Sequence, residues 1–282
     1  MSVSSEITRS AKSNLAFALN ILPRERRDDM VVFYAFCRVM DDLADARELS
    51  PKERIAGLDA WKFGILYGFV KPDEFQQEVI SLRDRHELPR ELLAEIIEGC
   101  GMDLMPQRFQ TWGDLSRYTW KVACAVGLVS IRLFGCKDPA SEKYAVALGH
   151  ALQITNILRD VGEDVANGGR IYLPLEDLAR FNYSEEELKD EVYDSRFQAL
   201  MCHQAQRAEA YYQQAERIFI NLPEADRQAL VPARIMEEIY HGVLDKIREG
   251  KYRVFDYRFK LSHPRKLAIL SKHLIARPFK IE

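Results

Sequence analysis

The sequence predicts an all-α protein that folds as one domain. Apolar residues recur at three- and four-residue spacing along nearly all 282 residues, whereas the alternation typical of strands is scarce. Only 14 glycines and 11 prolines occur, and most lie between the periodic stretches, where they separate about ten predicted helices. Since no repeat, low-complexity segment or linker divides the chain, we expect residues 1–282 to form a single helical domain.

Prolines and capping residues mark where the first helices begin. Pro23 is expected to open a helix that includes Tyr34 and Asp45, because proline is favoured at the start of a helix. The pair Ser50-Pro51 opens the next helix in the same way. Further boundaries are expected at Pro72-Asp73, Leu88-Pro89 and Lys137-Asp138-Pro139.

The second half of the chain is expected to hold longer helices. One should cover residues 139–165, followed by a loop over 165–174 that contains Asn167-Gly168-Gly169. The remaining helices are expected over about 184–220, 223–250 and 262–276.

The composition excludes several classes of protein. The formal net charge is −3 and no basic stripe stands out, so nucleic acid is not an expected partner. The cysteines are odd in number and scattered, as expected for reduced thiols in a cytoplasmic protein. They are Cys37, Cys100, Cys124, Cys136 and Cys202. No signal peptide or membrane span is expected, but peripheral contact with a membrane remains open.

Two acidic clusters lie about a hundred residues apart. Asp41 and Asp45 belong to YAFCRVMDDLAD, and Asp160 and Asp164 belong to QITNILRDVGED. Each pair is spaced by four residues, which places both carboxylates on one face of a helix. Because like charges so placed repel and weaken a helix, their occurrence in both segments predicts a cation between them.

Each cluster continues a polar stripe along its helix. Tyr34, Arg38, Asp41 and Asp45 share one face, as do Gln153, Asn156, Asp160 and Asp164. A solvated face is the usual interpretation of a single acidic stripe. Two stripes flanked by Arg, Asn, Gln and Tyr, with apolar residues around them, instead favour polar faces directed into a cavity.

Carboxylate oxygens with no His or Cys ligand beside them are the ligand set that suits Mg²⁺, with Mn²⁺ as the alternative metal. A dinuclear iron site would require Glu-x-x-His on two helices, and the sequence does not supply such a pair. Arg38 and Arg159 could bind phosphate oxygens, because guanidinium groups suit bidentate contacts.

At these residues the chain resembles the squalene/phytoene synthase family, the head-to-head prenyl transferases. LPRERRDDMVVFYAFCRVMDDLAD resembles the first family signature, and QITNILRDVGED with GRIYLP resembles the second. RYTWKVACAVGL resembles the segment between them, and YHGVLDKIREGKYRVF the C-terminal region. The resemblance extends from about Leu22 to Leu267.

The resemblance implies an all-α prenyl synthase bundle around a central cavity. It implies that Asp41, Asp45, Asp160 and Asp164 bind diphosphate through Mg²⁺. It also implies that Arg38 and Arg159 contact diphosphate, that Gln153 and Asn156 line the site, and that Tyr34, Tyr118 and Tyr240 lie beside the isoprenoids.

The sequence departs from the family pattern at three places. Cys124 stands where the family commonly has Gly, which bears on how two helices pack. The loop from Asp164 to Arg170 is one residue longer than usual because of Gly168-Gly169. Tyr257-Arg258 replaces two consecutive arginines, which leaves Arg258 as the candidate phosphate ligand there.

The family makes phytoene, dehydrosqualene, squalene and presqualene diphosphate, and this chain looks most like bacterial presqualene diphosphate synthases of hopanoid pathways. The expected substrate is therefore farnesyl diphosphate. NADPH would be needed only if the reaction continued to squalene, and no Gly-rich nicotinamide fingerprint occurs. Phytoene synthesis from geranylgeranyl diphosphate is the alternative, and a non-catalytic isoprenoid-binding relative is a more distant one. Downstream isoprenoid enzymes are conceivable partners.

Overall fold

A computed structural model describes residues 2–10, 21–46, 48–105, 107–166 and 168–275. These residues form helices and no strand, with one isolated bridge between Arg108 and Ile171. The predicted all-α class is therefore confirmed. Asn167 and the end of the last predicted helix lie outside the described residues.

The first half of the bundle consists of α1 (Val3–Ser10), α3 (Arg24–Asp45), α4 (Pro51–Tyr67), α5 (Glu74–Arg85), α6 (Arg90–Met102), α7 (Trp112–Thr119), the π-helix η1 (Trp120–Cys124) and α8 (Ala125–Phe134). The second half consists of α9 (Ala140–Ala166), α10 (Leu175–Arg180), α11 (Glu185–Lys189), α12 (Ser195–Phe219), α13 (Glu224–Ala229), α14 (Val231–Glu249) and α15 (His263–Ile275).

The predicted helix starts are explained by capping. Ser50 and Asp73 each accept a hydrogen bond from the backbone of the third helical residue, and that residue's side chain accepts one in return. These capping boxes satisfy backbone N–H groups that the first turn would leave unpaired. The expected starts of α4 and α5 are therefore confirmed.

Two predicted helices are wrong in part, because each is interrupted. The expected helix over 184–220 ends at Lys189 and resumes at Ser195 as α12. Glu191 adopts a left-handed backbone conformation, with φ +54°, which a continuous helix cannot contain. The expected helix over 223–250 is interrupted at Leu230, and Pro232 lies in the first turn of α14, where proline is tolerated.

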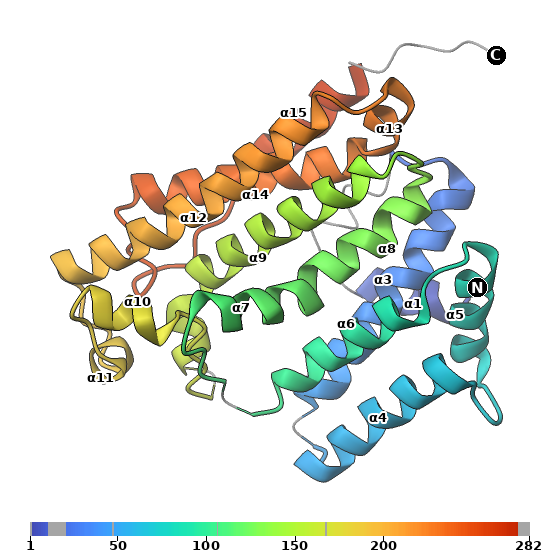
Figure 1. Ribbon diagram of the computed structural model, residues 1–282, viewed down its shortest axis with the longest axis horizontal. Coiled ribbons are helices and arrows are strands. Elements are labelled where there is room, and N and C mark those ends of the chain that lie inside the picture. Colours follow the sequence, from blue (N-terminus) through green and yellow to red (C-terminus); the bar gives the residue numbers. More distant parts are fainter. Residues whose placement is uncertain (1, 11–20, 47, 106, 167, 276–282) are drawn as a thin grey trace.

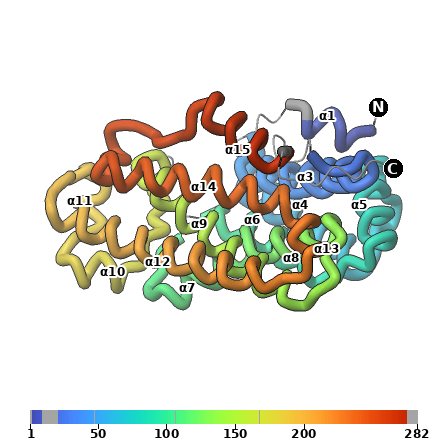
Figure 2. The backbone as a smooth tube through the Cα atoms, turned by 90° about the horizontal axis from the view of Figure 1, so that it is seen from above, coloured from blue at the N-terminus to red at the C-terminus, as the bar shows by residue number. Residues whose placement is uncertain are grey.

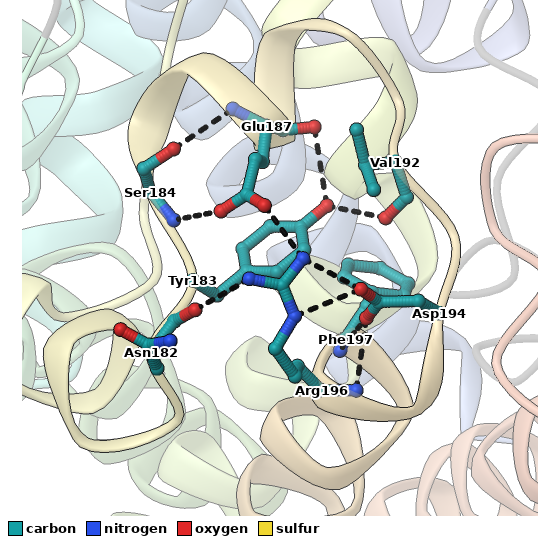
Figure 3. A network of polar contacts seen from close by, with 8 residues as sticks. All are labelled: Asn182, Tyr183, Ser184, Glu187, Val192, Asp194, Arg196 and Phe197. Carbon is teal, nitrogen blue, oxygen red and sulfur yellow. Dashed lines mark hydrogen bonds and ion pairs between the residues drawn. The ribbon is translucent and has the colours of Figure 1, made fainter.

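The break before α12 is held by a polar network (Figure 3). Asp194 caps α12 by accepting hydrogen bonds from the backbone N–H groups of Arg196 and Phe197. The Arg196 guanidinium contacts both Asp194 and Glu187, at 2.6 Å each. The Tyr183 hydroxyl donates to the Val192 carbonyl at 2.6 Å. Sequence periodicity alone does not reveal these contacts across the turn.

Helix α9 runs through the middle of the bundle, between α8 on one side and α12 on the other (Figure 1). It also packs against η1 and α14. Its buried side chains include Tyr144, Ile154 and Val161, whereas the residues of its polar stripe are half-buried. The same central position is visible from above (Figure 2).

The C-terminal ends of α3, α6 and α9 point towards the same end of the bundle, at the lower left of Figure 1. Because α3 and α9 carry the acidic clusters near these ends, the fold brings both clusters to one region. None of the described helices has the length and apolar character that crossing a bilayer requires.

Candidate active site

The first acidic cluster lies in the last two turns of α3, where Asp41 and Asp45 share one face. The Cys100 thiol, near the end of α6, donates a hydrogen bond to Oδ1 of Asp41 at 3.3 Å. Burial raises the pKa of Asp41 to about 6, because protein atoms crowd the carboxyl group although solvent still reaches it. The charges of Asp103 and Asp45 raise this pKa further, whereas the Arg38 charge lowers it.

Arg38 contacts the neighbouring acid Asp42 rather than Asp41. Its Nη2 lies 2.5 Å from Oδ1 of Asp42, and its Nε donates to Oδ2 at 3.1 Å. The Arg38 and Asp42 side chains are 47% and 56% exposed, and an ion pair this exposed is weak. An anionic substrate could therefore compete for Arg38 at little cost. Its role as a diphosphate ligand stays a prediction.

The second cluster is held by arginines. Arg159 donates to both oxygens of Asp160, at 2.8 and 2.5 Å, and each of these side chains is 15% exposed. Arg258 reaches the same carboxylate from beyond α14, with Nε 2.9 Å from Oδ1. It also contacts Glu163 at 3.0 Å. The structure thus brings Arg258 to the second motif, while its role as a phosphate ligand stays a prediction.

Asp164 carries a less compensated charge. Burial raises the pKa of Asp164 to about 7, and the nearby carboxylates of Asp160, Glu163 and Asp103 act in the same direction. Arg170 opposes this rise. A buried carboxyl group among other acids favours a proton or a cation close to it.

Three residues that the sequence analysis did not assign connect the two clusters. Asp103, which follows α6, accepts hydrogen bonds from the hydroxyls of Tyr118 and Tyr172, at 2.9 and 2.7 Å. Arg170 donates to the Asp103 carbonyl at 3.1 Å and lies 3.1 Å from Asp45. Two features of the sequence could have indicated these residues. Asp103 is a single acidic residue between Met102 and Leu104, and Arg170 and Tyr172 belong to the segment GRIYLP.

Tyr118 is buried in an aromatic stack. Its ring centroid lies 5.2 Å from that of Tyr172 and 5.4 Å from that of Phe109. Burial raises the pKa of the Tyr118 phenol well above its usual value, and the Asp103 charge adds to this. The hydroxyl therefore contacts Asp103 as a neutral hydrogen-bond donor.

An apolar cavity of about 210 Å³ lies between η1, α8, α9 and α14. Its walls include Val126, Ile131, Phe134, Tyr144, Leu148 and Met236. Three predicted site residues, Gln153, Asn156 and Tyr240, line it as well. Since the stripe on α9 continues from Gln153 and Asn156 to Asp160, one part of the cavity adjoins the second cluster.

The polar part of this cavity contains an unused hydrogen-bond acceptor. Oδ1 of Asn156 is buried without a partner in the described structure, while Nδ2 lies 3.5 Å from Oε1 of Gln153. A buried amide oxygen without a partner is costly, so a ligand donor or water is favoured there.

Tyr240 lies near Arg159. Burial lowers the pKa of Arg159, but the hydrogen bond to Asp160 and the neighbouring Tyr240 outweigh it and raise this pKa.

Tyr34 is half-buried on α3, on the stripe that leads to Asp41 and Asp45. The residues that line the apolar cavity come from η1, α8, α9 and α14, so the structure does not bring Tyr34 together with Tyr240 there. Its predicted place beside the isoprenoids stays a prediction.

The departures from the family pattern have local explanations. Cys124 packs against Gly149 of α9, and a Cβ added at Gly149 would lie 2.8 Å from the Cys124 Cα. This glycine therefore lets η1 approach α9 closely. In the longer loop, Gly168 and Gly169 have φ values of +93° and +67°, which glycine adopts without strain. The Arg170 N–H closes the loop on the Asp164 carbonyl at 3.0 Å.

The expectation that Asp41, Asp45, Asp160 and Asp164 hold Mg²⁺ stays a prediction. In the part of the chain that the structure describes, no three Asp, Glu, His or Cys side chains are gathered as a metal site requires. Like charges repel, and Asp160 is held by Arg159 and Arg258 instead. The raised pKa values of Asp41 and Asp164 nevertheless fit a cation near each cluster, because a positive charge would relieve the carboxylate repulsion.

The single Glu-x-x-His sequence, from Glu238 to His241, does not form an iron site. Glu238 pairs with Lys272 and His273 of α15, at 2.9 and 2.8 Å. His241 contacts Glu209 of α12 at 3.0 Å. The two side chains therefore bind different elements.

A helical bundle with an apolar cavity beside paired acidic motifs has the features of an isoprenoid synthase. The chain belongs to the squalene/phytoene synthase family, whose model matches residues 8–265. The 15-cis-phytoene synthase of Synechococcus elongatus is 36% identical over 266 residues, which cover 89% of this chain and 84% of that protein. The presqualene diphosphate synthase of Zymomonas mobilis is 34% identical over 269 residues, covering 94% and 89%.

A solved structure supports the same assignment. A dehydrosqualene synthase in complex with a ligand superposes with a TM-score of 0.81 at 32% identity, covering 96% of this chain and 94% of the other. The chain is thus a member of a family of head-to-head isoprenoid synthases, whose substrates are prenyl diphosphates.

Proposed function

We propose that this protein condenses two molecules of farnesyl diphosphate head to head, with Mg²⁺, to form presqualene diphosphate. The observation that carries the proposal is the apolar cavity that adjoins the Arg159–Asp160 pair through Gln153, Asn156 and Tyr240. Such a site suits a ligand with an apolar chain and an anionic head.

The proposed reaction begins with loss of diphosphate from one substrate, as the carbon–oxygen bond breaks and its electron pair leaves with oxygen. Arg159 and Arg258 are placed to contact the anionic head, since both already bind a carboxylate. Asp41, Asp45, Asp160 and Asp164 would hold Mg²⁺. The chemistry that Mg²⁺ supplies when bound is neutralisation of charge on the leaving diphosphate.

The allylic cation that remains must be protected from water. The cavity walls are aliphatic and aromatic, so they exclude water from the reacting carbons. Tyr240 can stabilise positive charge through its ring. The double bond of the second substrate then attacks the cation, and loss of one proton closes the cyclopropane ring. This product keeps its own diphosphate and needs no NADPH.

Phytoene synthesis from geranylgeranyl diphosphate is the second candidate, because several relatives carry that name and one is 36% identical. Two bulky residues of the cavity wall, Phe134 and Tyr144, favour the shorter farnesyl chain. Tyr144 is fully buried and donates a hydrogen bond to Glu237 at 2.8 Å, so it cannot easily move aside.

We also propose a cytoplasmic location with peripheral membrane contact, since the product is a lipid.

The test incubates purified protein with Mg²⁺ and either farnesyl or geranylgeranyl diphosphate, with and without NADPH, and identifies the products by mass spectrometry. Presqualene diphosphate from farnesyl diphosphate without NADPH is the expected result. Phytoene formed only from geranylgeranyl diphosphate would establish the second candidate instead. Failure to convert either substrate, by protein that binds both, would favour a non-catalytic relative.

A further inference from the structure

Asp103 is the C-cap residue of α6, and both its carboxylate and its backbone carbonyl accept hydrogen bonds from side chains. Oδ2 accepts the Tyr118 hydroxyl and Oδ1 accepts the Tyr172 hydroxyl, so each carboxylate oxygen has a strong donor. Its backbone carbonyl accepts a hydrogen bond from Arg170. Because both oxygens are occupied, Asp103 is poorly suited to bind a metal directly. Its contacts point to a different role.

These contacts tie both acidic clusters to the end of one helix. Arg170, held by the Asp103 carbonyl, reaches Asp45 of the first cluster at 3.1 Å. The same arginine follows the second cluster in the chain, and its N–H closes the loop on the Asp164 carbonyl. One turn earlier on α6, Cys100 contacts Asp41. The distance between the clusters therefore depends on where the end of α6 is held.

The charge of the Asp103 carboxylate decides which groups donate in its hydrogen bonds with the tyrosines. An ionised carboxylate only accepts hydrogen bonds, so both tyrosine hydroxyls must donate to it. Burial raises the pKa of Asp103, and the hydrogen bonds from Tyr172 and Tyr118 counteract that rise. A buried charge is tolerated only where donors surround it. Because the carboxylate needs both donors, it holds Tyr118 of α7 and Tyr172 of the loop after α9 next to the end of α6.

We propose that Asp103 is a positioning residue that sets the spacing of the two acidic clusters for binding of a diphosphate group together with Mg²⁺. The inference rests on the proposed function, because it assumes that both clusters bind the same ligand. A purely structural role would predict a loss of stability without a specific loss of binding.

The experiment measures binding of inorganic diphosphate in the presence of Mg²⁺ by isothermal titration calorimetry, together with the melting temperature. Asp103→Asn replaces one acceptor oxygen by a donor and leaves the shape unchanged. Binding should weaken about tenfold or more, as for residues that orient metal ligands. Tyr172→Phe removes a single donor to the same carboxylate and should weaken binding in the same direction by less.

Asp177→Asn is the matched control. Asp177 is buried, whereas Asp103 is half-buried, and like Asp103 it accepts hydrogen bonds, from Gln204 at 2.7 Å and Arg207 at 2.8 Å. Neither partner belongs to an acidic cluster. This variant should lose stability and keep wild-type binding. If Asp103→Asn does not fold, Tyr172→Phe decides the question against the same control.

Wild-type binding by folded Asp103→Asn and Tyr172→Phe would overturn the inference, as would an equal loss of binding in Asp177→Asn. A wild-type protein that does not bind diphosphate with Mg²⁺ would instead overturn the proposed function, and the inference with it. The two failures are therefore distinguishable.

Discussion

The Cys100 thiol donates its hydrogen bond to Asp41 across the α3–α6 interface, at 3.3 Å. This contact lowers the pKa of Asp41, against the effect of burial that raises it to about 6. The charge state of the first cluster is therefore set in part by a side chain from another helix, 59 residues away in the chain.

Cys100→Ala should shift the pH dependence of activity. Without the thiol donor, the pKa of Asp41 should rise further, so the ionised form would appear only at higher pH. We expect the acidic limb of the kcat/KM profile to move to higher pH. Cys100→Ser keeps a donor and should stay closer to wild type. Cys202→Ala, on α12, is the control. A profile unchanged in Cys100→Ala would show that the contact does not tune Asp41.

Asp41→Asn and Asp160→Asn should each reduce turnover by at least about a hundredfold, because each removes negative charge needed to hold a cation at the leaving group. Asp41→Asn should fold, since relieving like-charge repulsion does not weaken a helix. Asp160→Asn weakens the ion pairs with Arg159 and Arg258 and should lower the melting temperature, so its turnover is measured on protein shown to be folded. Steady-state kinetics at saturating Mg²⁺ measure the effect. A chelator should abolish wild-type activity, and added Mg²⁺ should restore it. Near-wild-type turnover of either variant would show that the charge of that aspartate is not needed for loss of diphosphate.

Asp164 should make stability depend on pH. Its pKa is raised from 3.8 in the unfolded chain to about 7 in the folded protein, so the folded state binds the proton more tightly. Stability should therefore fall as the pH rises from about 4 to about 7. Asp164→Asn cannot ionise and should raise the melting temperature at pH 8 by a few degrees without ligand.

The difference between Asp164→Asn and wild type should disappear below about pH 4, where Asp164 is protonated in both states. Thermal unfolding followed by circular dichroism at several pH values measures it. A difference independent of pH would mean that the side chain acts through packing instead of charge.

The sequence predicted what is periodic and local. The spacing of Asp41 to Asp45 and of Asp160 to Asp164 placed each pair on one helix face, and Ser50 and Asp73 marked helix starts that the structure confirms. It did not predict contacts between distant segments. Arg258 contacts Asp160 from 98 residues away, and no local pattern indicates that pairing.

Long-range partners also explain the errors. Asp103 looks unremarkable in sequence, because its function depends on tyrosines from two other segments. The break between α11 and α12 was missed because apolar and aromatic residues recur four apart on both sides of it, at Leu188 and Val192 and at Tyr193 and Phe197. The turn is held by Asp194 and Arg196, whose contacts exist only after the chain has folded.

Variants of Tyr34 test whether the polar stripe of α3 takes part in catalysis or whether this face only packs against other helices. Its ring lies on the same face of α3 as Asp41 and Asp45, and it is half-buried. If the ring stabilises a carbocation, the interaction contributes about 2 kcal/mol in a dry site. Tyr34→Phe would then keep most of the turnover, whereas Tyr34→Leu would lose roughly thirtyfold, which is that energy expressed as a rate.

Product formation and melting temperature should be measured together for both Tyr34 variants. If the hydroxyl matters, by holding diphosphate or accepting the proton lost on ring closure, turnover should fall equally in Tyr34→Phe and Tyr34→Leu. If Tyr34 only packs against neighbouring side chains, turnover should change no more than the lost stability explains. That result would show that Tyr34 does not contact the reacting carbons, and it would indicate that the reaction takes place in the cavity beside α9.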